Sequence, residues 1–201
     1  MTYELVISDL GGVVVEFNAD RLVHQVSQLL GRSFDEVQGI VYDKELLLPF
    51  ELGRIDAQTY YAGLQAKLQL SWTYDRFVQA WNDIFTENAD VTEIMSRLRA
   101  RHRLVALSNT NALHLAYIRA SIPSLSFFEE WIASCDVGLR KPDPQIYRLV
   151  LERCGVDARH AVYIDDRPDM VEGGRQAGLT AIRFEHSRQL EQDLRSIGLA
   201  L

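Results

Sequence analysis

Apolar residues along this chain follow two patterns, short runs near both ends and helical spacing between them. The short runs predict β-strands at residues 4–8, 103–107, 161–164 and 180–184. Helical patterns separate these runs, and capping signals such as Asp90 with Glu93 mark where helices begin. Strands that alternate with helices predict a parallel sheet covered by helices.

Residues 17–88 break this alternation, because no strand-like run occurs there and helical signals follow one another. We expect four helices in this stretch, from start and stop signals at Gly31, Ser33, Asp56 and Thr73. The predicted fold class is therefore α/β, with a Rossmann-like parallel sheet core covered by helices at residues 1–16 and 89–201. A small four-helix cap, residues 17–88, is inserted after the first strand.

Composition narrows the partners that we expect. The 201 residues carry a net charge of -7, which disfavours nucleic acid because that partner requires a basic surface. No stretch approaches the roughly 20 apolar residues of a membrane helix, and no signal peptide pattern opens the chain. We therefore expect a cytoplasmic protein with no membrane partner, in which Cys135 and Cys154 are reduced.

A candidate reactive carboxylate follows the first predicted strand. Asp9 comes directly after residues 4–8 and precedes a turn at Gly11 and Gly12. In open α/β sheets, ligands bind outside the carboxyl ends of the strands, where loops and helix N-termini converge. Asp9 is therefore a candidate catalytic residue, although an Asp at this place is also typical of a simple turn.

Groups suited to an anion occur at two later points. Ser108 and Asn109 follow the strand at 103–107, where a hydroxyl and backbone N–H groups can hold phosphate oxygens, although both residues are also good helix caps. Lys141 lies in a turn whose neighbouring prolines restrict it, whereas an ordinary lysine is a solvated surface charge. Both interpretations stay open from these residues alone.

Two adjacent carboxylates, Asp165 and Asp166, follow the strand predicted at 161–164. Adjacent acids repel each other unless a cation lies nearby, and hard oxygen ligands suit Mg²⁺. The alternative is an ordinary helix start. The pair is a candidate magnesium site.

Together and in this order, these motifs resemble the haloacid dehalogenase superfamily over the whole chain. Asp-Leu-Gly-Gly-Val, Ser-Asn-Thr-Asn and Gly-Leu-Arg-Lys-Pro are similar to the branch that contains bacterial α-D-glucose-1-phosphate phosphatases. The resemblance implies a cap that closes over the site and selects the substrate. It implies catalytic roles for Asp9 and Lys141, phosphate binding by Ser108, Asn109 and Lys141, and Mg²⁺ held by Asp9, the Gly11 carbonyl, Asp165 and Asp166.

The reaction implied by the resemblance is hydrolysis of a small phosphate monoester, such as α-D-glucose 1-phosphate, through an aspartyl-phosphate on Asp9. Most phosphatases of the superfamily carry a second Asp, the general acid and base, where this chain has Gly11. Without this second Asp, no group at this position delivers a proton to the leaving oxygen, which typically contributes about 10²- to 10⁴-fold in rate. We therefore expect slow turnover and a preference for sugar 1-phosphates, whose leaving oxygen is more acidic than that of 6-phosphates.

Two other functions stay open. A dehalogenase of the superfamily also uses an Asp nucleophile, but it has no use for the pair Asp165 and Asp166. A catalytically weak phosphate-binding module is compatible with Gly11. Seven further polar residues lie near the motifs or within the cap, where substrate contact and surface roles both explain them: Arg140, Arg167, Asn111, His114, Glu51, Arg54 and Asp56.

Overall fold

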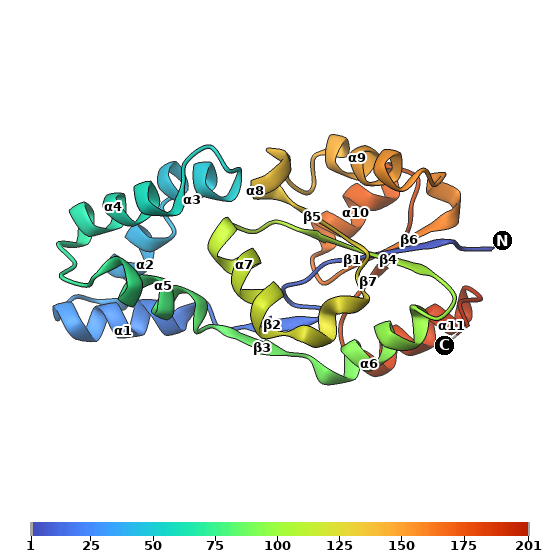
Figure 1. Cartoon of the computed structure of the whole chain (residues 1–201), viewed down its shortest axis with the longest axis horizontal. Helices are drawn as coiled ribbons and strands as arrows, with labels where there is room; N and C mark the ends of the chain where they lie inside the picture. Colours follow the sequence, from blue (N-terminus) through green and yellow to red (C-terminus); the bar gives the residue numbers. More distant parts are fainter. Residues whose placement is uncertain (1, 201) are drawn as a thin grey trace.

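A parallel sheet with helices on both faces forms the centre of the computed structural model, which describes residues 2–200 (Figure 1). Its strands lie in the order β5-β4-β1-β6-β7, and all four neighbouring pairs are parallel. They span Leu5–Ser8 (β1), Arg103–Ser108 (β4), Glu130–Ala133 (β5), Ala161–Asp165 (β6) and Thr180–Arg183 (β7). Ser8 lies opposite both Ala106 and Ile164, so the carboxyl ends of the three central strands meet at one edge. The predicted α/β sheet is confirmed, with β5 as a strand that the sequence pattern did not predict.

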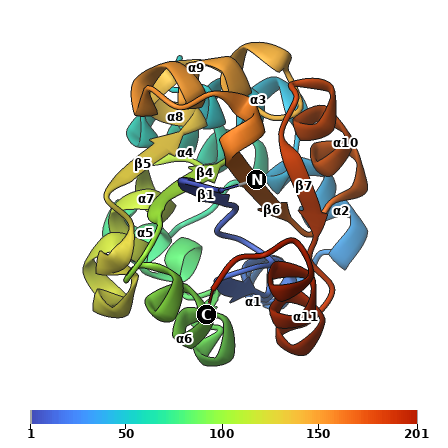
Figure 2. The same ribbon diagram turned by 90° about the vertical axis from the view of Figure 1, so that its right-hand side faces the viewer.

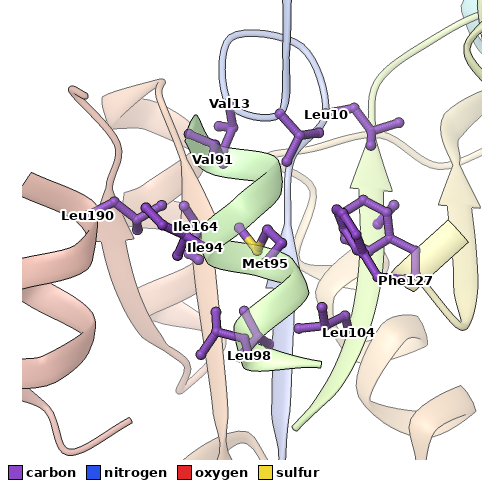
Figure 3. Packing of buried hydrophobic residues seen from close by; sticks show 14 of the residues in the cluster. Leu10, Val13, Val91, Ile94, Met95, Leu98, Leu104, Phe127, Ile164 and Leu190 are labelled. Carbon is purple, nitrogen blue, oxygen red and sulfur yellow. The ribbon is translucent and has the colours of Figure 1, made fainter. Parts of the chain in front are cut away.

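Helices cover both faces of the sheet (Figures 1 and 2), and alternate strand residues belong to two different buried clusters. On one face Val6 packs in a buried cluster with residues of α6, α7 and α11, whereas on the other Leu5 and Ile7 pack with residues of α9. Figure 3 shows Ile94, Met95 and Leu98 of α6 within the first cluster. The helices span Ala89–Leu98 (α6), Ala112–Ser121 (α7), Ser134–Val137 (α8), Pro144–Cys154 (α9), Pro168–Gln176 (α10) and Ser187–Ser196 (α11). Two 3-10 turns, Pro123–Phe127 (η1) and Ala158–His160 (η2), complete this part of the chain.

Five consecutive helices, which we call the helical insertion, lie to one side of the sheet (Figure 1). They span Asp20–Leu30 (α1), Phe34–Val41 (α2), Lys44–Glu51 (α3), Ala57–Leu68 (α4) and Tyr74–Asn82 (α5). Their apolar faces form a buried cluster of their own that is distinct from the two clusters against the sheet. A short antiparallel ribbon of β2 (Val15–Phe17) and β3 (Phe85–Glu87) joins the insertion to the rest of the chain.

The structure corrects two details of the prediction for residues 17–88. The helices in this stretch of the described chain are five rather than four, because α3 was not anticipated; Pro49 lies inside it, near its end. Proline cannot donate a backbone hydrogen bond and usually ends a helix, so the sequence pattern argued against one here. A strand, β3, also lies in this stretch, although it is too short to show a period. The predicted N-caps Ser33, Asp56 and Thr73 each accept a backbone hydrogen bond.

Two further expectations concern the whole chain. None of the described helices has the length and apolar character that crossing a membrane requires. Cys135 and Cys154 are both free thiols, as predicted.

Candidate active site

The ends of β1, β4 and β6 bring the predicted site residues to one place. Asp9 follows β1, Ser108 ends β4, and Asp165 and Asp166 lie at the end of β6. One carboxylate oxygen from each of Asp9, Asp165 and Asp166 lies within 4.8 Å of the others. The parallel sheet therefore gathers three acids that are up to 157 positions apart in the chain.

Lys141 is the cation at the centre of this cluster. Its side chain is only 2% exposed, and its Nζ lies 3.0 Å from Asp9 Oδ1 and 2.6 Å from Asp165 Oδ2. The Asn109 amide fixes the backbone of this lysine, donating through Nδ2 to the Lys141 carbonyl (2.9 Å) and accepting from the Lys141 N–H (2.8 Å). The contacts assign Asn109 a role in positioning Lys141, and phosphate binding by Asn109 stays a prediction.

Protein donors occupy both oxygens of Asp165. Oδ2 accepts from Lys141 Nζ and from the Tyr163 hydroxyl, and Oδ1 accepts from the Arg167 backbone N–H (2.9 Å). Asp165 is fully buried. A carboxylate bonded in this way holds its neighbours in place, so its predicted role as a metal ligand has less support than those of Asp9 and Asp166.

Asp166 is half-buried and lies against the loop that carries Gly11 and Gly12. Gly12 has φ +80°, and a Cβ at this position would lie 2.7 Å from Asp166 Oδ2. Glycine is therefore required both by the backbone conformation and by the close approach of the carboxylate. Among the described residues, none donates a hydrogen bond to the Gly11 carbonyl. Asp9, Asp166 and this carbonyl are hard oxygen donors, a set that fits Mg²⁺.

Burial dominates the electrostatics of the acids. It raises the pKa of Asp9 above the usual range of a carboxyl, while Lys141 lowers this pKa in part and Asp165 adds to the rise. The pKa of Asp166 is also raised, by burial first and by the neighbouring Asp165 second. Both acids would ionise more readily with a further positive charge between them.

A cavity of about 290 Å³ extends from Asp9 into the helical insertion. Its wall includes Ser108, Lys141 and Asp166 on the side of the sheet. Four residues near the motifs, for which the sequence left substrate contact and a surface role equally open, also line it: Asn111, His114, Arg140 and Arg167. Apolar side chains, among them Phe17, Trp81 and Phe85, form much of the remaining wall. The sequence does not distinguish Trp81 as a residue of the cavity wall, because its helical spacing is typical of a core residue.

Trp81 is tied to α7 by a buried polar network. Asn111, the N-cap of α7, accepts at Oδ1 from the His114 N–H (3.1 Å) and from Trp81 Nε1 (3.4 Å). His114 Nε2 lies 3.1 Å from the Trp81 carbonyl, and its Nδ1 lies 3.0 Å from Asn111 Nδ2. The rings of Trp81 and His114 stack with centroids 4.9 Å apart. This network fixes one end of the insertion against the core.

The three polar residues at the middle of the insertion lie in different places relative to the cavity. Glu51 lines the cavity, with its Oε2 3.5 Å from Arg140 Nη2. Asp56 instead caps α4, accepting from the Thr59 N–H (2.7 Å). Arg54 is exposed and is not part of the cavity wall. The structure therefore favours the surface role, which the sequence also left open, for Asp56 and Arg54.

Comparisons with known proteins agree with this arrangement. A family model described as haloacid dehalogenase-like hydrolase matches residues 3–178. A phosphatase of Mycobacterium tuberculosis is 25% identical, and the match covers 100% of this chain and 98% of that protein. D-ribitol-5-phosphate phosphatase of Bacteroides thetaiotaomicron is 22% identical, and the match covers 94% of this chain and 95% of that protein. A crystal structure of a family enzyme from Bacteroides thetaiotaomicron, in complex with magnesium and inorganic phosphate, has a TM-score of 0.82 at 20% identity and covers 91% of this chain and 94% of that one. This structural likeness shows the fold alone.

Proposed function

We propose that this chain, which belongs to the haloacid dehalogenase-like hydrolases, hydrolyses small phosphate monoesters through an aspartyl-phosphate on Asp9. The observation that carries the proposal is the cluster itself, a buried lysine between Asp9 and Asp165 with Asp166 beside them. The names of the full-length relatives, both phosphatases, support the same reaction.

The residues have separate tasks in this reaction. Asp9 attacks phosphorus, and Lys141 offsets charge on the transferring oxygens while keeping Asp9 and Asp165 from repelling each other. The Ser108 hydroxyl donates to a phosphate oxygen. Asp9, Asp166 and the Gly11 carbonyl would hold Mg²⁺, with Asp165 behind them. When bound, the ion neutralises negative charge on the phosphoryl group and orients it for attack.

The helical insertion acts, in this proposal, as the cap of the enzyme, with residues 17–88 as the cap domain and residues 1–16 and 89–201 as the core domain. The separate hydrophobic cluster of the insertion supports this division. So does the β2-β3 ribbon, because the chain enters and leaves the insertion side by side. A cytoplasmic location stays a prediction.

A sugar phosphate such as α-D-glucose 1-phosphate is the substrate that we propose. Relatives named for D-ribitol 5-phosphate and for phosphorylated carbohydrates support this class. The absence of a carboxyl at Gly11 supports the 1-phosphate in particular, because its leaving oxygen requires less protonation than that of an alkyl ester and so depends less on the group that replaces this carboxyl.

One assay tests the proposal against its alternatives. Release of phosphate and of halide is measured from a panel of phosphate esters and 2-haloacids, first with Mg²⁺ and then with excess chelator. We expect phosphate release that requires Mg²⁺ and falls below about a few per cent in Asp9→Asn, since an amide is not a phosphoryl acceptor. Halide release would indicate a dehalogenase, and binding of inorganic phosphate without turnover would indicate a phosphate-binding module. Circular dichroism of Asp9→Asn controls for unfolding.

A further inference from the structure

Glu51 is an acidic group in the cavity that the proposed mechanism does not use. It is the last residue of α3, and its side chain lines the cavity that also contains Asp9. Its carbonyl accepts a hydrogen bond (2.7 Å) from the hydroxyl of Ser134, the first residue of α8. Two residues further on, Gly53 lies so close to the core that a Cβ there would be 2.0 Å from the Cys135 carbonyl. These contacts hold the backbone around Glu51 against the core, and Figure 1 shows α3 beside α8.

The proposed reaction requires a proton for the leaving oxygen, and Gly11 cannot supply one. Asp9, Lys141 and Asp166 already have roles in the reaction. Of the other ionisable groups that line the cavity, Tyr42 donates its hydroxyl hydrogen to the Ala19 carbonyl (2.6 Å), and His114 has both ring nitrogens in hydrogen bonds. Arginine does not release a proton in proteins, which excludes Arg140 and Arg167. Among the described residues of the cavity wall, Glu51 remains.

The surroundings of Glu51 favour the protonated form of its carboxyl more than water would. Burial raises its pKa, whereas Arg140 and Arg167 lower this pKa in part. The nearby Tyr60 hydroxyl donates to the Val41 carbonyl (2.7 Å) and does not bond to Glu51. Arg140 pairs with the carboxylate, with its Nη2 3.5 Å from Glu51 Oε2. Arg140 thus holds one oxygen of a carboxyl that belongs to the cavity wall.

We propose that Glu51 is the general acid and base of this enzyme, taking the place of the carboxyl that is absent at position 11. The inference rests on the proposed function. In the first step the bond between phosphorus and the leaving oxygen breaks as Asp9 Oδ bonds to phosphorus, and the Glu51 proton passes to the leaving oxygen to give the free alcohol. In the second step Glu51 takes a proton from water as the water oxygen attacks phosphorus. This step breaks the bond to Asp9, releases phosphate and restores both carboxyl groups.

Leaving groups of different acidity test the assignment, because a general acid matters only where the departing oxygen requires a proton. We compare kcat/KM of wild type and Glu51→Gln for an alkyl phosphate and for 4-nitrophenyl phosphate. The variant should lose about 10²-fold or more on the alkyl ester and less than about 10-fold on the nitrophenyl ester. Glu51→Asp should recover part of the alkyl rate. Glu36→Gln, which alters an exposed acid of α2 paired with Arg32, serves as the matched control and should change neither rate.

Each result decides the assignment. Equal losses of kcat/KM on both esters would overturn it, because they would indicate that Glu51 only holds Arg140 or the insertion in place. An unchanged kcat/KM on the alkyl ester would also overturn it. Wild type gives a second test that needs no variant to fold. Its rate on the alkyl ester should fall on the alkaline side while the nitrophenyl rate stays level, and parallel profiles would refute the idea. Failure of the phosphatase proposal is distinguishable, because wild type would then hydrolyse neither ester, or Asp9→Asn would retain turnover on both.

Discussion

Acidification from about pH 7 to about pH 5 should destabilise this protein through His114, which lines the cavity. Its Nε2 must donate to the Trp81 carbonyl (3.1 Å), because that oxygen only accepts, and Nδ1 then accepts from the Asn111 amide (3.0 Å). A second proton on the ring would turn Nδ1 into a donor that faces another donor. Burial adds to this effect and lowers the pKa of His114 from 6.5 to about 4.

The sign and size of the effect follow from linkage between protonation and folding. The unfolded chain binds the proton with a pKa of 6.5 and the folded chain with one of about 4, so the free energy of unfolding falls as the pH drops from about 6.5 to about 4. One pKa unit corresponds to about 1.4 kcal/mol, which gives about 3 kcal/mol for the whole interval. Between about pH 7 and about pH 5 the expected loss is about 2 kcal/mol.

Urea unfolding of wild type and His114→Gln at both pH values measures this loss. Other groups that titrate, Asp9 among them, are shared by the two proteins and cancel to first order in the difference. The variant should be less stable at about pH 7, since it loses part of the network to Trp81, but it should lose about 2 kcal/mol less than wild type on acidification. Equal losses in the two proteins would refute the argument that His114 is held neutral.

Three further predictions concern the loops around the site. Asp166→Ala should lose most phosphate release and recover part of it as Mg²⁺ is raised, because a ligand rather than the nucleophile is removed; full activity of wild type in chelator would contradict this. Gly53→Ala should lower the urea unfolding free energy by at least about 2 kcal/mol, from a positive φ and a clash with the Cys135 carbonyl. Gly31 has a similar positive φ but open space where its Cβ would lie, so Gly31→Ala is a control that lacks the clash. Equal losses of unfolding free energy in the two variants would show that the clash has no effect. In the Glu51→Gln background, where no acid serves the leaving oxygen, Gly11→Asp should narrow the preference of kcat/KM for glucose 1-phosphate over glucose 6-phosphate once the Phe17 ring, 3.2 Å from the added Cβ, moves aside; an unchanged ratio in a folded variant would contradict the leaving-group argument.

The central strands could be predicted from the sequence because their apolar runs are buried on both faces. Every residue of β1 and of β6 is buried, so neither run has the alternation of a half-exposed strand. The edge strand β5 has two partly exposed residues among its four and follows a 3-10 turn, which leaves no clear period. The short α3 contains Pro49 and is stabilised by packing against its neighbours rather than by its own propensity.

The acids and the lysine of the site could be predicted for a similar reason, since parallel strands must bring their carboxyl ends together. The separate roles of the individual site residues could not be predicted from the sequence. That Asn109 bonds to the Lys141 backbone, and that Lys141 bonds to Asp165, depends on contacts between segments more than 20 residues apart. No local pattern records such a contact, and the same holds for the network of His114 and Trp81.

Charge balance gives a reason why Lys141 cannot complete the site alone. Asp9, Asp165 and Asp166 contribute three negative charges when ionised, and Lys141 contributes one positive charge that it already shares between Asp9 and Asp165. A phosphate dianion that approached this set would meet a net charge of about -2 in a buried place, where like charges repel strongly. A divalent cation between Asp9 and Asp166 would bring the set to neutrality before the substrate's charge is added. We infer that substrate and cation bind cooperatively, because the cation offsets the negative charge of the acids that would otherwise repel the phosphate.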